Sequence, residues 1–270
     1  MNENGDITTL GRGGSDTTGV ALAVALNADE CQIYTDVDGI FTTDPRVCSK
    51  ARLLKEVSFE EMLELSSSGA KVLQLRSVEY ASKFNLPIRV LSSFNEGDGT
   101  LVQEEKNIME RPIVSGISSI DTEAKLTIRG VPDVPGIAAK ILSPISEAGI
   151  EVDVIVQNIS ADNCTDFTFT VDKGDAENAK EILQKTSASL GGGLVEVDHD
   201  IAKISVVGRG MRAHAGVASK MFQALAKDEI NISMITTSEI KISVVIKESE
   251  MKKAVTALHN AFDLDKELDS

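Results

Sequence analysis

The sequence predicts an α/β domain followed by two copies of a small α+β module. In the first hundred residues, a segment with helical spacing of apolar residues (Val72–Val78) precedes a short apolar strand (Ile88–Leu91), which is typical of an α/β fold. The second half contains an internal repeat of about 75–80 residues, which indicates two copies of one module. A chain of 270 residues also approaches the length at which one core divides into several. We expect domains over residues 1–105, 113–198 and 199–270.

The repeat becomes visible when the stretch from Ala124 is aligned with the stretch from Ala202. Gly136 then matches Gly216, and Lys140 matches Lys220. Each copy has the pattern strand, helix, strand, strand, helix, with apolar residues alternating in the strands and recurring at helical spacing between them. This order predicts an antiparallel sheet with its helices on one face, which is a ferredoxin-like arrangement.

Composition excludes several classes of partner. The chain has 42 acidic and 27 basic residues, a formal net charge of −15, so we expect neither nucleic acid nor an anionic membrane as a partner. No apolar run reaches the ~18 residues of a membrane span, and the N-terminus lacks a signal-peptide pattern. Cys31, Cys48 and Cys164 have the spacing of neither a disulfide framework nor a metal site. We therefore expect a cytoplasmic protein without a tightly bound metal or organic cofactor.

A glycine-rich turn, Gly11–Thr18, leads into an apolar helix that we expect to begin at about Thr17. Such a turn before a helix N-terminus binds phosphate or carboxylate groups well, although it is also compatible with a plain connection. It lacks the Gly-Lys-Ser/Thr of a Walker A loop and the glycine spacing of a Rossmann fingerprint.

The next segment is a strand, Cys31–Asp36, followed by an acidic loop. Asp36, Asp38 and Asp44 suggest a calcium loop, but the glycine and glutamate positions of an EF-hand do not fit. Lys71 lies near a predicted helix start, where a cation is unfavourable unless an anion neutralises it; the alternative is an ordinary surface lysine. Residues 96–112 have the composition of a linker.

In each copy of the repeat, the loop before the first helix places a glycine at or near the helix start. Free backbone N–H groups there favour an anion, while the simpler interpretation is a turn and a cap. Gln157 and Asn158 end the following strand and are placed to meet the polar groups of a ligand.

A series of motifs resembles the aspartokinase family over essentially the whole chain: GRGGSDTT, YTDVDGIFTTDPR, SSSGAKVL, RGVPDVPGIAAKIL, VIVQNIS, TDFTFTV, GMRAHAGVASKMF and ITTSEIKISVV. The resemblance implies the carboxyl-terminal part of an amino-acid kinase domain followed by two ferredoxin-like ACT domains. It implies phosphorylation of L-aspartate with Mg-ATP as co-substrate, feedback control by lysine, threonine or both, and a homodimer or hetero-oligomer formed through the ACT domains.

The resemblance also implies roles for individual residues. The catalytic and substrate-binding residues would be Arg12, Ser15 and Asp16. The nucleotide would be held by Thr35, Asp36, Phe41, Arg46, Lys71 and Val72. The effector would meet Asp133, Gly136, Ile137, Ala138, Gln157 and Asn158 in the first ACT domain, and Met211, Arg212, His214, Gly216 and Val217 in the second.

The sequence departs from the family in one respect. The Lys-Phe/Tyr-Gly-Gly segment, whose lysine would meet the transferred phosphoryl group, does not occur in it. We therefore expect a partial kinase sheet with an exposed edge and no kinase activity from the chain alone. The alternative is a non-catalytic, amino-acid-sensing regulatory subunit. Another amino-acid kinase, such as acetylglutamate kinase, is disfavoured because tandem ACT domains are not typical of it.

Overall fold

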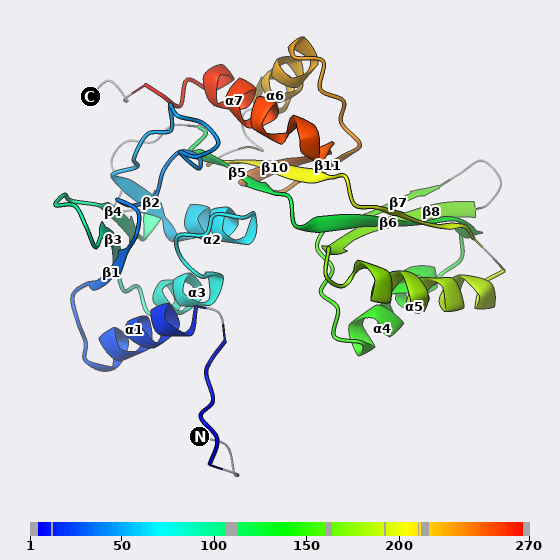
Figure 1. Ribbon diagram of the computed structural model, residues 1–270, viewed down its shortest axis with the longest axis horizontal. Helices are drawn as coiled ribbons and strands as arrows, with labels where there is room; N and C mark the ends of the chain where they lie inside the picture. Colours follow the sequence, from blue (N-terminus) through cyan, green and yellow to red (C-terminus); the bar gives the residue numbers. More distant parts are fainter. Residues whose placement is uncertain are drawn as a thin grey trace. The chain divides into compact units, whose positions relative to one another are not determined.

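The computed structural model describes residues 5–11, 13–105, 113–159, 164–191, 193–209, 211 and 216–266. These form two compact units (Figure 1). Unit 1 comprises Met1–Ser119, Ile204–Val244 and Glu250–Ser270, and unit 2 comprises Ile120–Lys203 and Val245–Ser249. No helix in the described ranges is both long and apolar enough to cross a membrane.

The first hundred residues form an α/β layer pair, as the sequence predicts. The chain runs α1 (Gly14–Ala25), β1 (Cys31–Thr35), β2 (Glu56–Ser58), α2 (Phe59–Ser67), α3 (Leu75–Lys83), β3 (Ile88–Ser92) and β4 (Thr100–Gln103). The sheet order is β1-β3-β4-β2, with β1 parallel to β3 and β2 parallel to β4. Among the described strands β1 pairs only with β3, so it forms an edge of this sheet.

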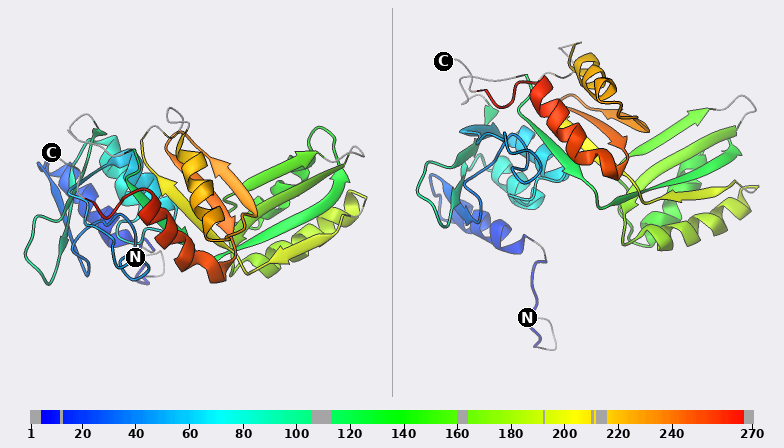
Figure 2. Two further views of the ribbon diagram at one scale, coloured as in Figure 1. Left: turned by 90° about the horizontal axis from the view of Figure 1, so that it is seen from above. Right: turned by 45° about the horizontal axis from the view of Figure 1, so that its top comes forward.

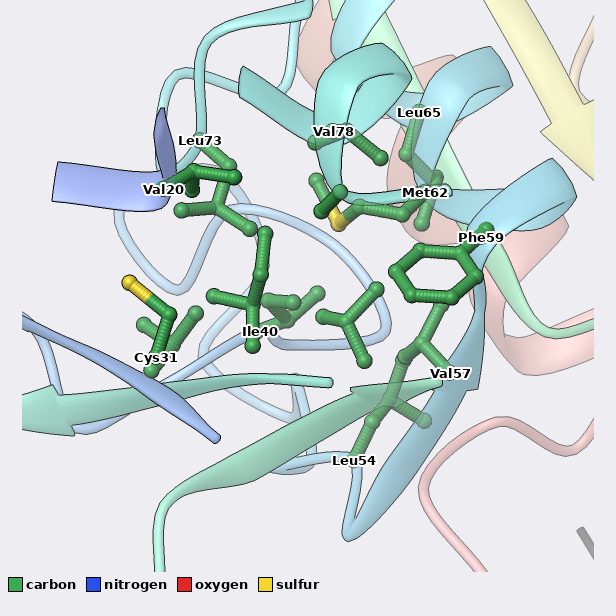
Figure 3. Close-up of a cluster of buried hydrophobic side chains, with 14 of the residues drawn as sticks. Val20, Cys31, Ile40, Leu54, Val57, Phe59, Met62, Leu65, Leu73 and Val78 are labelled. Carbon is green, nitrogen blue, oxygen red and sulfur yellow. The ribbon is translucent and has the colours of Figure 1, made fainter. Parts of the chain in front are cut away.

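The core of this layer pair lies between the sheet and its helices. Figure 3 shows Met62 and Leu65 of α2 and Val78 of α3 above Leu54 and Val57 of the strand side. Met62 and Val78 are fully buried, and α2 begins with a complete capping box between Ser58 and Glu61. Burial of this apolar face holds α2 and α3 against the sheet.

The predicted linker over residues 96–112 contains a strand, so that prediction is wrong for part of the segment. β4 lies between β3 and β2, and its Thr100 and Val102 are fully buried. Gly99, with φ of 61°, makes the turn possible, because a Cβ there would lie 2.0 Å from the carbonyl oxygen of Val90. β4 has only four residues and polar neighbours in sequence, so the alternation of apolar residues is too short to predict a strand there.

The first module has the predicted order of elements. It contains β6 (Glu123–Pro132), α4 (Ile137–Glu147), β7 (Ile155–Ile159), β8 (Cys164–Asp172), α5 (Ala176–Ser189) and β9 (Val195–Asp198). The antiparallel sheet has the order β7-β8-β6-β9, and α4 and α5 lie on one face of it (Figure 2). Ile137, Ile141 and Ile145 of α4 are buried, as their spacing predicts.

The second module is built in the same way from β10 (Ala202–Val207), α6 (Gly216–Lys227), β11 (Met234–Thr237), β12 (Lys241–Ile246) and α7 (Met251–Ala261). Its sheet order is β11-β12-β10-β5, where β5 is Gly116–Ile120. β5 thus belongs to the sheet of the second module, although it falls within the range 113–198 predicted for the first. The first module is inserted in the chain between β5 and β10.

A side-chain hydrogen bond that occurs in both modules supports the repeat. In the first module, the hydroxyls of Thr127 on β6 and Thr168 on β8 lie 3.0 Å apart. In the second, the hydroxyls of Ser205 on β10 and Ser243 on β12 lie 2.8 Å apart. The same cross-strand pair therefore occurs between corresponding strands of the two copies.

Several predicted boundaries shift by a few residues. α1 begins at Gly14 rather than at about Thr17, and α3 begins at Leu75, so Lys71 precedes the helix by four residues instead of lying at its start. β7 and β11 begin later than the alternating apolar residues suggest. Val154 is nevertheless buried, and its N–H donates to Thr170 Oγ1 at 3.2 Å.

Candidate functional site

The glycine-rich turn closes against the start of α3. Gly13 has φ of 71° at the N-cap of α1, a left-handed conformation that glycine adopts readily. A Cβ on Gly13 would lie 1.9 Å from Gln74 Cγ, so the backbone of Gly13 packs directly against the side chain of Gln74, the residue before α3. The Gly14 N–H donates to Gly11 O, and the Thr17 hydroxyl donates to Gly13 O at 3.0 Å. These contacts hold the described part of the turn, from Gly13 onward, against the residue before α3.

Two of the three predicted catalytic residues lie in the first turn of α1. Ser15 is exposed, Asp16 is half-buried, and the Ser15 hydroxyl lies 3.3 Å from Asp16 Oδ1. Both side chains are accessible to a ligand at this helix N-terminus, where the backbone dipole favours an anion. Arg12, the third, lies outside the described residues.

The predicted nucleotide residues begin at the carboxyl end of β1. Thr35 is half-buried there, and its hydroxyl donates to Asp36 Oδ1 at 3.2 Å. In the following loop, Asp44 binds Arg46 through both carboxylate oxygens, with Nη2–Oδ2 at 2.8 Å and Nε–Oδ1 at 3.0 Å. This fork geometry fixes the direction of the Arg46 guanidinium.

Electrostatics join these residues into one cluster. The hydrogen bond from Arg46 lowers the pKa of the Asp44 carboxyl most strongly, and the positive charge of Lys71 lowers it further. The pKa of Arg46 is raised chiefly by Asp44, with a smaller contribution from Asp36. Lys71 therefore acts on Asp44 and Asp36 acts on Arg46, and we call these four residues the charged cluster.

Asp44 was not predicted as a site residue. Its position suggested only a calcium ligand, a function that the glycine and glutamate spacing excludes. The signal that could have found it is the Asp-Pro-Arg order, because an aspartate two residues before an arginine can orient the guanidinium through a local turn. The N–H of Arg46 donates to Asp44 Oδ1 at 2.9 Å, which is such a turn.

Lys71 and Val72 precede α3 on a short loop. Lys71 is exposed, whereas the side chain of Val72 packs against the core between the sheet and α1–α3. Phe41 is half-buried and forms a backbone bridge with Leu53. Lys71 thus offers an exposed cation to a ligand, while Val72 and Phe41 are each only partly exposed.

A separate hollow of about 460 Å³ lies over β1 and β3. It is lined by Gln32 and Tyr34 of β1, by Arg89 and Leu91 of β3, and by the loop that follows β3. None of the predicted site residues lines it. Arg89 within it is engaged with Glu30, with Nη2–Oε2 at 2.8 Å, so its charge is largely neutralised.

The predicted effector residues of the first module gather at one end of its sheet. Register places Val131 of β6 opposite Thr165 of β8, and Thr165 opposite Ile159 of β7. The loop carrying Asp133 and Gly136 follows β6 at the same end at which Asn158 lies near the end of β7. Asp133, Gln157 and Asn158 are exposed, whereas the Ile137 side chain belongs to the core and Ala138 packs against it.

In the second module, the corresponding loop is described only in part. Met211 and Val217 are buried, and Gly216 begins α6. Arg212 and His214 lie outside the described residues. Within the described ranges, no group of three or more His, Cys, Asp or Glu side chains is arranged to hold a metal ion.

Comparison with known families defines the class of protein first. Residues 1–92 match the amino acid kinase family, residues 126–190 match the ACT domain, and residues 204–262 match a further ACT domain model. The chain is therefore part of an amino-acid kinase joined to two ACT domains, as the fold indicates.

Individual relatives then specify the family. The chain is 65% identical to an aspartokinase of Pseudomonas aeruginosa, over 97% of this chain and 64% of that protein. It covers 99% of a chain in a crystal structure of aspartokinase alpha and beta subunits, at 47% identity, 56% coverage of this chain and a TM-score of 0.53. The chain belongs to the aspartokinase family.

A third comparison concerns a ligand complex. A structure of Escherichia coli aspartokinase III with aspartate and ADP matches with a TM-score of 0.82 and 30% identity, over 96% of this chain and 58% of that one. The chain thus spans somewhat less than two thirds of the length of these full-length relatives.

Proposed function

We propose that the charged cluster and the N-terminal turn of α1 form the nucleotide side and the aspartate side of an aspartate kinase. In this function, the γ-phosphoryl group of Mg-ATP is transferred to the β-carboxylate of L-aspartate. The observation that carries the proposal is the charged cluster itself, because Lys71 is exposed there and Arg46, oriented by Asp44, lies in the loop that follows β1. Phosphate oxygens are anions that such cations and a neighbouring helix N-terminus neutralise well.

The chemistry of the reaction fits these residues. A carboxyl group with a pKa of about 3.9 is already an anionic nucleophile at neutral pH, so no general base is needed. The protein instead has to hold two anions in line and offset their repulsion. Lys71 and Arg46 would contact the nucleotide phosphates, while Asp36 would accept from ribose hydroxyls. Ser15 and Asp16 would lie on the aspartate side.

The sequence has no Lys-x-Gly-Gly segment, and we propose that turnover depends on one supplied with this chain. The test is the hydroxamate assay, in which hydroxylamine traps aspartyl phosphate formed from Mg-ATP and L-aspartate. The chain alone should bind nucleotide without turnover, and addition of a polypeptide with that segment should restore activity. Asp16→Asn should abolish the restored activity. Turnover by the chain alone, lost in Asp16→Asn, would show that the segment is dispensable.

A second function, amino-acid sensing, is favoured by the end of the sheet in the first module. There an exposed carboxylate, Asp133, lies three residues before the left-handed Gly136 that caps α4, and Asn158 is exposed on β7. An amino acid presents an ammonium and a carboxylate, which an aspartate and a helix N-terminus can bind respectively. The chain also covers 99% of the regulatory subunit of aspartate kinase from Thermus thermophilus, at 41% identity and a TM-score of 0.54.

Sensing is tested by thermal melting with lysine or threonine. A ligand at 100 times its Kd should stabilise the unit that binds it by about 2.7 kcal/mol. Asp133→Ala should remove the shift while leaving the melting temperature without ligand nearly unchanged, since Asp133 is exposed. An unchanged shift in the variant would remove Asp133 from the site.

We further propose association with a second chain through these modules, either as a homodimer or as a hetero-oligomer, which light scattering measures.

A further inference from the structure

α7 of the second module contains a fully buried histidine. His259 is 0% exposed, and its Nε2 lies 2.9 Å from the hydroxyl oxygen of Thr42. Its other ring nitrogen, Nδ1, is buried without a hydrogen-bond partner among the described residues. A buried imidazole costs free energy unless its polar atoms are satisfied. The contact with Thr42 is therefore the interaction that makes this histidine tolerable in the interior.

Thr42 lies in the middle of the loop that carries the predicted nucleotide residues. Its N–H donates to Arg52 O at 2.8 Å, and its carbonyl accepts from the N–H of Ile117 at 2.7 Å. Its hydroxyl oxygen also accepts from the N–H of Arg52 at 3.0 Å. Together with the contact to His259, every polar atom of this fully buried threonine is in use.

These bonds link two parts of unit 1 that are far apart in sequence. Ile117 on β5 and His259 on α7 belong to the second module, whereas Thr42 belongs to the loop between β1 and β2. Asp36 lies six residues before Thr42 and Arg46 lies four residues after it. The centre of the loop is thus fastened to the second module, while the two ends carry the charges of the charged cluster.

Other contacts between the same two parts avoid this loop. Lys241 of β12 forms an ion pair with Glu64 of α2, with Nζ–Oε2 at 2.7 Å. Ser115, just before β5, donates to the carboxylate of Glu61, also on α2. Removing one of these contacts weakens the association without touching the loop. The contact of His259, like the bond from the N–H of Ile117 to Thr42 O and that from Lys50 Nζ to Asn260 Oδ1, joins the second module to the loop itself.

We propose that His259 is a positioning residue for the loop Asp36–Arg46, so that the second module sets the conformation from which Asp36 and Arg46 meet a nucleotide. The inference rests on the proposed nucleotide site. α7 also packs against α6, whose first residues, Gly216 and Val217, lie in the predicted effector loop. A change at that loop can therefore reach the nucleotide loop through two packed helices and one hydrogen bond.

The test compares four single variants of the full chain and the double variant His259→Leu/Thr42→Val. His259→Leu and Thr42→Val each remove the hydrogen bond, and His259→Gln retains a polar group at the reach of Nε2. Lys241→Met is the matched control, because it removes the Glu64 ion pair in the same association. Two readouts are needed: hydrogen exchange of the backbone amides of residues 36–54, and the Kd for Mg-ADP by calorimetry.

We expect His259→Leu and Thr42→Val to speed exchange within the loop and to weaken Mg-ADP binding by about three- to tenfold, the effect of one buried hydrogen bond. The double variant should be no weaker than Thr42→Val, which already removes the bond to His259. His259→Gln should restore most of the affinity, and Lys241→Met should leave both loop exchange and affinity near wild type.

Three results would overturn the inference. Loop exchange in His259→Leu that equals wild type would show that the histidine does not hold the loop. The same would follow if Lys241→Met opened the loop equally, or if the effects of the two single variants added fully. Failure of the wild-type chain to bind Mg-ADP would instead refute the proposed nucleotide site, and the exchange data would still decide whether His259 positions the loop.

Discussion

Replacing Gly13 by alanine tests the shape of the turn before α1. Two costs are expected from the structure. The first is the left-handed conformation, φ of 71°, which costs a residue with a Cβ about 1–2 kcal/mol. The second is steric, because the new Cβ would lie 1.9 Å from Gln74 Cγ and 2.5 Å from Gln74 Cβ. Overpacking of this kind costs about 1–3 kcal/mol.

The two costs together predict a loss of about 2–5 kcal/mol in the free energy of unfolding. Gln74 Cβ is fixed to the backbone at the N-cap of α3, so rotation of the side chain cannot relieve the whole clash. The turn would have to move away from α3, which would also displace Ser15 and Asp16. Urea unfolding, monitored by circular dichroism, measures the loss.

Gly11→Ala is the matched control, because it changes the same turn. Gly11 also has a positive φ, 80°, but the nearest atom to its added Cβ is Arg76 Nη2 at 4.0 Å. Its cost should be limited to the conformational part, about 1–2 kcal/mol. If Gly13→Ala proves no more destabilising than Gly11→Ala, the close packing of the turn against Gln74 is wrong.

Two further predictions concern stability. Burial lowers the pKa of His259, so the folded chain keeps this ring neutral while the unfolded chain protonates it below about pH 6.5. The charged groups that act on the ring are Asp265, which opposes the shift, and Lys50 and Arg52, which add to it. Stability should fall as the pH drops below about 6.5, by up to ~1.4 kcal/mol per pH unit, and urea unfolding of His259→Gln should show a shallower fall; equal slopes would contradict this. Ser58→Ala should cost about 1–2 kcal/mol by removing the capping box of α2, and a cost equal to that of the exposed Ser67→Ala would contradict it.

The repeat was the part of the fold most accessible from the sequence. Alternation in strands such as Phe167–Val171 and helical spacing such as Val217, Met221 and Leu225 reflect burial on one face, and those residues are buried as predicted. The pairing of β5 with β10 in the second sheet could not be predicted from the sequence, because Gly116–Ile120 has no pattern that identifies its partner strand. Pairing between strands distant in sequence depends on tertiary packing.

The candidate site shows a similar division. Motifs predicted one function for Asp36, Arg46 and Lys71, and in the structure Asp36 acts on Arg46 while Lys71 acts on Asp44. Asp44 was missed as a partner of Arg46, although the Asp-Pro-Arg order is a sequence signal for such a local ion pair. His259 was missed because a lone histidine on an amphipathic helix resembles any core residue until its partner, 217 positions away, is known.

The central claim is that the charged cluster binds the phosphates of a nucleotide. The most direct measurement is calorimetry of Mg-ADP binding to the purified chain, comparing wild type with Lys71→Met and with Lys83→Met, a control lysine in the last turn of α3. We predict that Lys71→Met raises the Kd by about tenfold, as expected for loss of a charged phosphate contact worth ~1.4 kcal/mol, and that Lys83→Met leaves it unchanged. Equal affinity of all three proteins, or no binding by the wild type, would contradict the account.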